Sequence, residues 1–327
     1  MTIQAETQQS RENFVSTIIP FSLLLLGVFF LSFAAILIRL SEQEIGANAT
    51  IFNRLWIATI FLGLWNQITN FIPLLASESS PSQENKIINY LGILLLSAIV
   101  DLMCLLFWAW SLNQTSVTNS NLLHNLTPIF ATFGGWLFLN QSFNSRFVVG
   151  VILASLGSSA IAFSDLQFGS QYFRADSLAL LSAVFYGIGS LIYERLRYRF
   201  SAATLLFWTC FFRSILLLPL ALLTDPQLFP SSWSGWLTVI CLGIFCLGLG
   251  NLIFIHSLKQ FSAGFVSLFL LLGPILTAIF AWIIFSEKLN FINWIAFTTV
   301  LVGIYFAKSG QGAQKSTRDV INSDEEY

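Results

Sequence analysis

Long apolar stretches separated by short polar segments are the dominant pattern along this chain. Each stretch is continuous over about 20 residues, the length an α-helix needs to cross a bilayer core about 30 Å thick. Apolar and polar residues do not alternate, which excludes the strands of a membrane β-barrel. We therefore predict an all-α polytopic membrane protein of ten transmembrane helices. The stretches lie at about 18–40, 47–66, 87–110, 115–139, 146–164, 176–195, 203–223, 235–258, 262–285 and 290–308.

The composition indicates that lipid is the main solvent of this chain. Apolar residues make up 56% and charged residues only 9% of its 327 residues, too few charges to cover a soluble domain. The net charge of −1 gives no indication of a nucleic-acid partner. The four cysteines fall inside apolar stretches, so we interpret them as apolar residues rather than metal ligands or a disulfide. We expect no cofactor. The first stretch is too long for a signal-peptide core and is expected to remain as a helix.

The distribution of lysine and arginine predicts the orientation, because these residues collect in cytoplasmic loops. With the N-terminus inside, the inner loops and tails carry ten of them and the outer loops three. The inner set is Arg11, Lys86, Arg146, Arg195, Arg197, Arg199, Lys259, Lys308, Lys315 and Arg318, and the outer set is Arg39, Arg174 and Lys288. Both termini are therefore predicted to be cytoplasmic, with tails at 1–17 and 309–327 expected to be disordered. The longest connection is expected at about 67–86.

An internal repeat divides the chain into two units of five predicted helices. A shift of 146 residues without a gap aligns a series of identical residues in the two halves. The matched pairs are Ser111 with Ser257, Gln114 with Gln260, Ser116 with Ser262, Leu126 with Leu272, Pro128 with Pro274, Trp136 with Trp282, Asn144 with Asn290 and Gly157 with Gly303. A shift of 159 residues similarly aligns Arg54 with Arg213. Because five is odd, the second unit enters the membrane from the opposite side, an arrangement common in secondary transporters. Duplication has also produced some channels and membrane enzymes.

Several short motifs of the second half carry a family resemblance. These are Leu272-Gly-Pro-Ile, Phe285-Ser-Glu-Lys-Leu and Val302-Gly-Ile-Tyr, with a looser match in the first half. In order and spacing they resemble the EamA branch of the drug/metabolite transporter superfamily. The resemblance implies two inverted repeats, at 18–165 and 174–308, and export or exchange of amino acids or other small metabolites. One departure is Gln141, where the pattern has an acidic residue. Its counterpart Glu287 is retained, and we interpret it as structural.

Asp101 is the carboxylate predicted to lie deep in the membrane, near the middle of the third stretch. A charge there costs about 3 kcal/mol or more unless it has a partner or a water-filled cavity. Its repeat counterpart is Leu247, so the carboxylate is not part of the shared scaffold. Two interpretations are open. Asp101 either accepts a proton or a substrate ammonium group, or it forms a structural hydrogen bond between helices.

The fourth stretch opens with polar residues that are too numerous to face lipid. Asn121 and Asn125 share a helical face, and His124 borders it. The equivalent stretch of the second half is nearly all apolar. We therefore predict that at least one of these three residues contacts substrate, with the second half providing an apolar wall. His124 is also a candidate for relaying protons with Asp101, or is a neutral histidine hydrogen-bonded between helices.

Other residues complete the candidate site. Arg54 and Arg213 are candidates for binding a substrate carboxylate, or they have a symmetric structural role. Trp108 and Tyr186 are weaker candidates for cavity walls. Pro128 and Pro274 are predicted to kink the fourth and ninth helices, since proline removes a backbone hydrogen bond.

The sequence as a whole favours a secondary transporter that exports small polar metabolites by alternating access. Coupling to protons through Asp101 and His124 and facilitated exchange without coupling are the two options. There is no phosphate-binding glycine-rich loop and no hydrolase or metalloprotease motif, so we expect neither an ATP-driven pump nor an enzyme. The alternative is a non-transport protein on the same fold, either a small membrane enzyme or an assembly factor. The expected partners are a small-molecule substrate and the lipid bilayer, with the protein a monomer or homodimer. A multi-pass position in a bacterial inner membrane fits the short loops.

Overall fold

The computed structural model describes residues 20–71, 84–112, 114–115, 117–161, 173–285, 291–310 and 312–314. Within these ranges the chain forms helices and no strand. In the described part of the chain, six helices are long and apolar enough to cross a membrane, and shorter apolar helices occur at Ser145–Ala160 and Ala263–Leu276. The prediction of an all-helical, multi-pass membrane protein is thus confirmed. The N-terminal tail, most of the C-terminal tail and Glu287 lie outside the described residues.

The helices coincide with the predicted stretches to within a few residues. After helical residues 20–32 they are α2 (Ala34–Ser41), α3 (Ala47–Phe71), α4 (Glu84–Leu112), α5 (Val117–His124), α6 (Thr127–Phe138), α7 (Ser145–Ile161), α8 (Phe173–Leu196), α9 (Ala202–Thr224), α10 (Trp233–Cys241), the π-helical segment η5 (Leu242–Gly250), α11 (Asn251–Ser257), α12 (Ala263–Leu270), α13 (Leu272–Phe285) and α14 (Phe291–Ser309). The largest difference concerns the connection expected at 67–86, because α3 and α4 both extend into it. The apolar stretches correspond to the part of each helix expected in the bilayer core, whereas the helices themselves continue into polar residues at their ends.

The fourth predicted stretch is a helix interrupted before its proline. α5 ends at His124, and α6 begins at Thr127 with Pro128 as its second residue. Pro128 lies four residues after His124, and a proline ring clashes with the carbonyl at that distance, so the helix breaks there. The carbonyl of His124 instead accepts a 2.7 Å hydrogen bond from the hydroxyl of Thr127. That carbonyl is therefore engaged within the chain.

The eighth and ninth predicted stretches are also irregular. α12 ends at Leu270, four residues before Pro274, which repeats the break of the first half. The eighth stretch contains η5, a run of π-helix between α10 and α11. Gly243 and Gly248 of η5 face α3, where added Cβ atoms would lie 2.6 and 2.8 Å from side-chain atoms of Ile57 and Phe61. π-Helical turns are rare in proteins, and those that occur are often found at functional sites.

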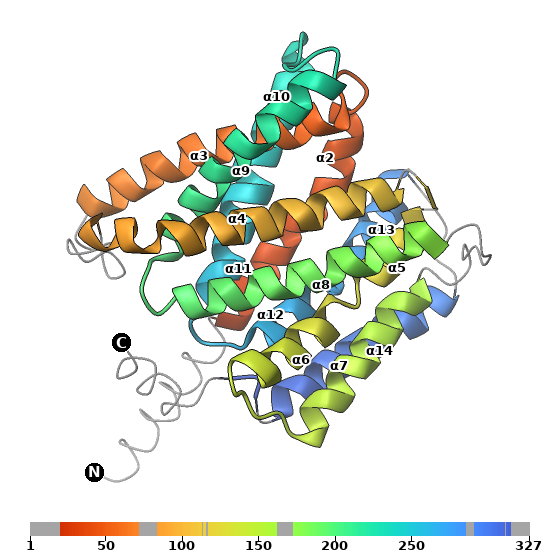
Figure 1. Ribbon diagram of the computed structural model, residues 1–327. Coiled ribbons are helices and arrows are strands. Elements are labelled where there is room, and N and C mark those ends of the chain that lie inside the picture. Colours follow the sequence, from red (N-terminus) through yellow and green to blue (C-terminus); the bar gives the residue numbers. More distant parts are fainter. Residues whose placement is uncertain are drawn as a thin grey trace, which may run out of the picture.

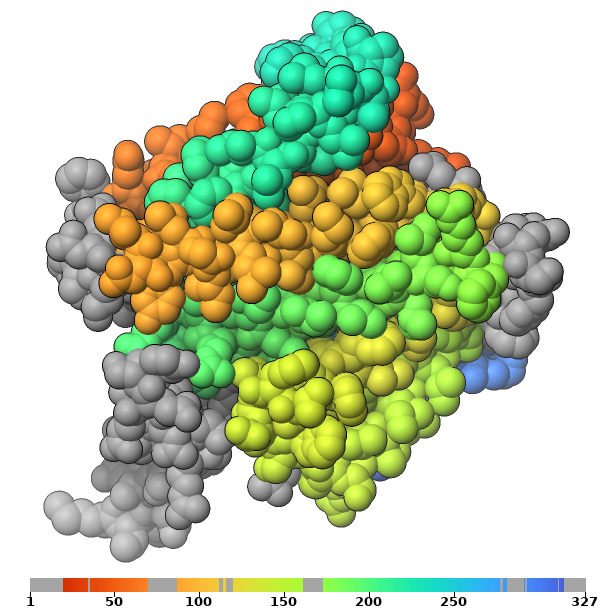
Figure 2. Space-filling view, in the orientation of Figure 1, coloured from red at the N-terminus to blue at the C-terminus, as the bar shows by residue number. Residues whose placement is uncertain are grey.

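Helices of the two sequence halves pack against one another. α3 packs on α9, α4 on α8, α6 on α12 and α7 on α14. Figure 1 shows α4 and α8 side by side across the molecule and the pair of α7 and α14 at one edge. Figure 2 shows the outer surface of α4 beside that of α8. Leu95, Leu96 and Ile99 of α4 are exposed, as expected for a surface that faces lipid.

The pair of α7 and α14 is antiparallel and reciprocal. A Cβ at Gly157 would lie 2.8 Å from the backbone nitrogen of Val300, and a Cβ at Gly303 would collide with the backbone nitrogen of Ala154. The shift of 146 residues converts the first contact into the second. Residue numbers rise along one helix as they fall along the other. The contact therefore has the form of a two-fold axis perpendicular to both helices.

Candidate functional site

A buried charged centre joins α4 of the first half to α8 and α9 of the second. Oδ2 of Asp101 lies 3.5 Å from Nη1 of Arg213 and accepts a 2.6 Å hydrogen bond from the hydroxyl of Tyr193. The side chains of Asp101 and Arg213 are only 15% and 8% exposed. A Cβ at Gly189 would lie 2.5 Å from the other carboxylate oxygen of Asp101. Because Gly189 has no side chain, α8 leaves room for this carboxylate.

Arg54 lies on α3, beside this centre. α3 packs on α9, the helix of Arg213, and the charges of the two repeat-equivalent arginines repel each other. Nε of Arg54 is sealed from solvent, and no described residue offers it a hydrogen-bond partner. Arg213 is better satisfied, since its guanidinium also donates to the carbonyl of Thr209 and the sulfur of Cys210.

His124 forms a second cluster, nearer the other end of α8. Its Nδ1 lies 2.8 Å from the hydroxyl oxygen of Ser182, and that hydroxyl donates a 2.6 Å hydrogen bond to the carbonyl of Ala179. Because the single hydroxyl proton is used in that bond, the hydroxyl oxygen must accept from His124, which places a proton on Nδ1. The imidazole packs against Trp108 and Tyr186, with ring centroids 6.0 and 5.7 Å away.

The two predicted asparagines differ in their partners. Asn121 accepts a 3.2 Å hydrogen bond from the indole of Trp108, which places it in the His124 cluster. Asn125 donates a 3.0 Å hydrogen bond to Ser158 of α7 and so points to another helix. The structure therefore divides the predicted site residues into a charged centre, an aromatic and amide cluster around His124, and Asn125 at the α7 contact.

Tyr193 and Glu194 are important residues that the sequence analysis missed. Tyr193 lies seven residues after Tyr186, on the same face of α8, and this spacing was the available signal. Glu194 is 1% exposed. It accepts hydrogen bonds of 2.6 Å from the carboxamide of Gln141 and 2.7 Å from the backbone N–H of Ala263. This contact ties the first turn of α12 to α8 and to the loop between α6 and α7.

The C-terminal tail begins at the same end of the molecule. Residues 312–314 fall within the tail expected to be disordered, yet they are hydrogen-bonded. Ser262 donates its hydroxyl to the carbonyl of Gly312 over 2.7 Å and its N–H to that of Ala313 over 3.2 Å. An isolated bridge joins Phe261 to Gln314. The tail thus covers the loop before α12.

At the opposite end, carboxylates join the two halves. Glu44, between α2 and α3, accepts hydrogen bonds of 2.5 to 2.7 Å from the backbone and hydroxyl groups of Ser231 and Ser232, before α10. These bonds, chiefly from Ser232, lower the pKa of Glu44 to about 2. In return, Asp225 after α9 accepts a 2.5 Å hydrogen bond from the N–H of Ala49 at the start of α3. Each half therefore caps a helix of the other.

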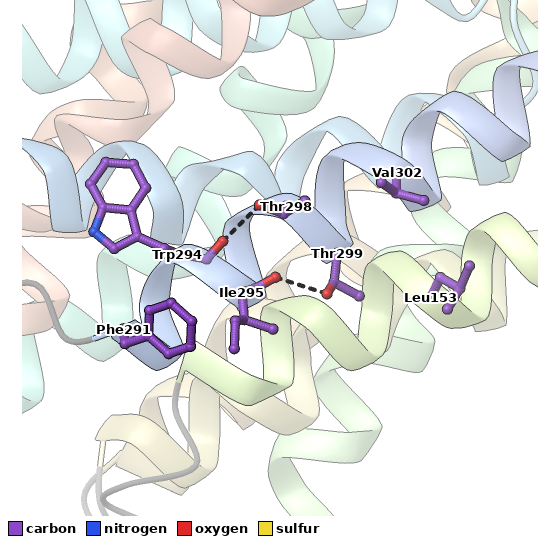
Figure 3. Close-up of a pocket in the computed structure, with 7 residues that line it drawn as sticks. All are labelled: Leu153, Phe291, Trp294, Ile295, Thr298, Thr299 and Val302. Carbon is purple, nitrogen blue, oxygen red and sulfur yellow. Dashed lines mark hydrogen bonds between the residues drawn. The ribbon is translucent and has the colours of Figure 1, made fainter.

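The hollow between α7 and α14 is a poor candidate for binding a polar solute. It is lined by Leu153, Phe291, Trp294, Ile295, Thr298, Thr299 and Val302 (Figure 3). Its two threonine hydroxyls already donate 2.8 Å hydrogen bonds to carbonyls of their own helix. The charged centre and the His124 cluster, which lie between the halves, offer more polar groups.

Comparison with known proteins identifies the family. The model of the EamA-like transporter family matches residues 18–163 and 173–308. An "uncharacterized transporter" of Archaeoglobus fulgidus is 24% identical over 228 residues, covering 68% of this chain and 76% of the relative. The "uncharacterized transporter YetK" of Bacillus subtilis is 22% identical over 222 residues, covering 66% of this chain and 65% of the relative.

A solved structure described only as a crystal structure of a protein shares the fold. It has a TM-score of 0.73 at 16% identity, and covers 89% of this chain and 96% of its own. The family match extends over both repeats. This chain therefore belongs to the EamA-like transporter family.

Proposed function

We propose that this protein is a secondary transporter that carries amino acids or related small polar metabolites across a bacterial inner membrane, in the export direction, by alternating access. The family and the names of the relatives support transport in general. The observation that carries the proposal is the charged centre of Asp101, Arg213 and Tyr193. Buried charges in a membrane protein are costly and mark solute or ion pathways.

The proposed architecture is ten transmembrane helices in two inverted repeats. In this scheme α5 with α6, and α12 with α13, each count as one interrupted helix, and α10 to α11 as another. The antiparallel, reciprocal contact of α7 with α14 supports the inversion, because a two-fold axis perpendicular to membrane helices lies in the membrane plane.

We propose that both termini are cytoplasmic on the basis of the lysine and arginine distribution, and contacts between loops support the way this topology divides the loops between two sides. This orientation assigns the loops containing Glu44 and Ser231 to the outer side, and these two residues are hydrogen-bonded. It assigns Gln141, Ala263 and the start of the C-terminal tail to the inner side. Gln141 and Ala263 meet at Glu194, and the tail contacts the residue before Ala263. No described contact links the two groups of loops directly.

The proposal also covers coupling. Asp101 and His124 are titratable groups of the first half that contact the second half, and we propose them as proton carriers. A facilitated exchanger would need neither. The non-transport alternative would use the same buried groups only to hold helices together.

Uptake of a labelled panel of amino acids and metabolites into proteoliposomes tests this function, with and without a pH gradient. Asp101→Asn is the informative variant, and Arg39→Gln, which changes an exposed charge, is the control. Saturable uptake by the parent protein supports transport. Dependence on the gradient that is lost only in Asp101→Asn supports proton coupling. A folded protein that moves no member of a broad panel would favour the non-transport alternative.

A further inference from the structure

The repeat brings two positive charges together inside the protein. Arg54 and Arg213 are equivalent under the shift of 159 residues, and their helices, α3 and α9, pack on each other. The charge of Arg213 acts on that of Arg54. Like charges in a poorly solvated interior repel more strongly than in water. Such a pair needs a nearby carboxylate for each member.

Among the described residues, Arg213 has such a carboxylate and Arg54 has none within ion-pair distance. Asp101 pairs with Arg213, but the position equivalent to Asp101 in the second half is Leu247, a buried residue of η5. Leu247 adjoins Cys246, one of the neighbours that influence Arg54. In the alignment of the two halves, an apolar residue thus occupies the position that carries the carboxylate partner of Arg213.

No described residue compensates for this loss. Within the described part of the chain, no carboxylate lies within ion-pair distance of Arg54. Glu42 is exposed and acts on Arg54 from beyond ion-pair distance. The guanidinium retains some accessible surface and has an unpartnered Nε. The backbone of Arg54 lies beside η5, since a Cβ at Gly243 would lie 3.2 Å from the carbonyl oxygen of Arg54.

We propose that Arg54 receives a carboxylate of the transported solute, so that the solutes are organic acids or amino acids and not simple amines. The proposal rests on the transport function proposed above. A guanidinium binds a carboxylate through two parallel hydrogen bonds, and this would supply the ion pair that the second half lacks. Asp101 is engaged by Arg213 and Tyr193, so an ammonium group on the solute is tolerated but not required.

Two matched series of compounds test the charge requirement. The first is propionate, L-alanine, L-alaninamide and propylamine, and the second is 3-phenylpropionate, L-phenylalanine, L-phenylalaninamide and 2-phenylethylamine. Each compound is titrated against the purified protein while thermal unfolding is followed, and is also offered to proteoliposomes. We expect the acids and amino acids of at least one series to raise the unfolding temperature and to enter the vesicles. The amides and amines should do neither.

Variants at the two arginine positions and at Leu247 locate the receptor. Arg54→Gln should weaken the response to carboxylates at least tenfold without lowering the stability of the ligand-free protein, because it removes a repelling charge. Arg54→Lys should retain part of the response. Leu247→Asp should supply an internal carboxylate and abolish the response, whereas its uncharged match, Leu247→Asn, should keep it. Arg39→Gln changes an exposed arginine and should behave as the parent.

The two proposals fail in different ways. Uptake of an amide or amine without any response to carboxylates would overturn the role of Arg54 and leave transport standing. An Arg54-dependent thermal response to carboxylates without uptake would support the receptor and count against transport. A protein that no carboxylate stabilises, or an Arg54→Gln variant that responds as the parent does, overturns the inference directly.

Discussion

The carboxamide of Gln141 donates a 2.6 Å hydrogen bond to the carboxylate of Glu194. This contact explains why a neutral residue replaces the acidic one of the family pattern at this position. A glutamate at 141 would place two carboxylates within hydrogen-bond distance of each other in a buried region. Repulsion between the two carboxylates would also weaken the hydrogen bond that Glu194 accepts from the N–H of Ala263 at the start of α12.

Gln141→Glu is therefore expected to destabilise the protein. The loss of a hydrogen bond to a charged group costs about 1.5–3 kcal/mol, and repulsion adds to it. Thermal unfolding in detergent measures the effect. The double variant with Glu194→Gln restores one donor and one acceptor and should recover part of the loss. Equal stability of Gln141→Glu and the parent would contradict the contact.

Gly303→Ala tests the packing of α7 on α14. Alanine normally stabilises a helix by about 1 kcal/mol relative to glycine, but here its Cβ would collide with the backbone of Ala154. We expect a lower unfolding temperature. Gly92→Ala is the matched control on α4, because a Cβ there meets nothing within 4 Å, and it should be neutral or stabilising. If both variants stabilise the protein, the close approach of the two helices is wrong.

Two substitutions of His124 separate its two nitrogens. Asparagine retains a donor near the position of Nδ1 and can keep the bond to Ser182, whereas glutamine places its amide near Nε2. We expect His124→Asn to retain stability but reduce uptake of a transported probe, because Nε2 is the nitrogen left for solute. His124→Gln should lose about 1 kcal/mol of stability with the Ser182 bond. Unimpaired uptake by both variants would assign His124 a purely structural role.

Low pH is expected to weaken the hydrogen bonds between Glu44 and the loop containing Ser231 and Ser232, and so to lower the stability of the protein. The pKa of Glu44, about 2 in the folded protein, lies below the usual value of about 4.3 for glutamate. The stabilisation is therefore fully present above about pH 4.3 and is lost as the pH falls towards 2. Comparing the unfolding temperatures of the parent and Glu44→Gln from pH 6 to pH 3 checks this. The difference between them should shrink towards acid pH, and a constant difference would contradict the hydrogen-bonded carboxylate.

The sequence predicted the helices and the position of Asp101 in α4, because apolar length and charge cost act locally along the chain. Contacts between helices that are far apart in the sequence could not be predicted in this way. The periodicity of α8 places Tyr186 and Tyr193 on one face, but it does not show that this face meets Asp101. Gln141 was recognised as a departure, but its explanation depends on Glu194, 53 residues away. The π-helical turn in η5 had no sequence signal beyond its glycines.

The reciprocal contact between α7 and α14 restricts how the two halves can diverge. Gly157 and Gly303 each make room for the backbone of the other repeat, so a larger residue in one half has to be accommodated by the other. Asp101 and Leu247 are under no such mutual restriction, and there the copies already differ. Repeats of this kind can therefore change specificity at positions where the equivalent residues do not contact each other. At the contact of α7 with α14, the two repeats have to keep matching small residues.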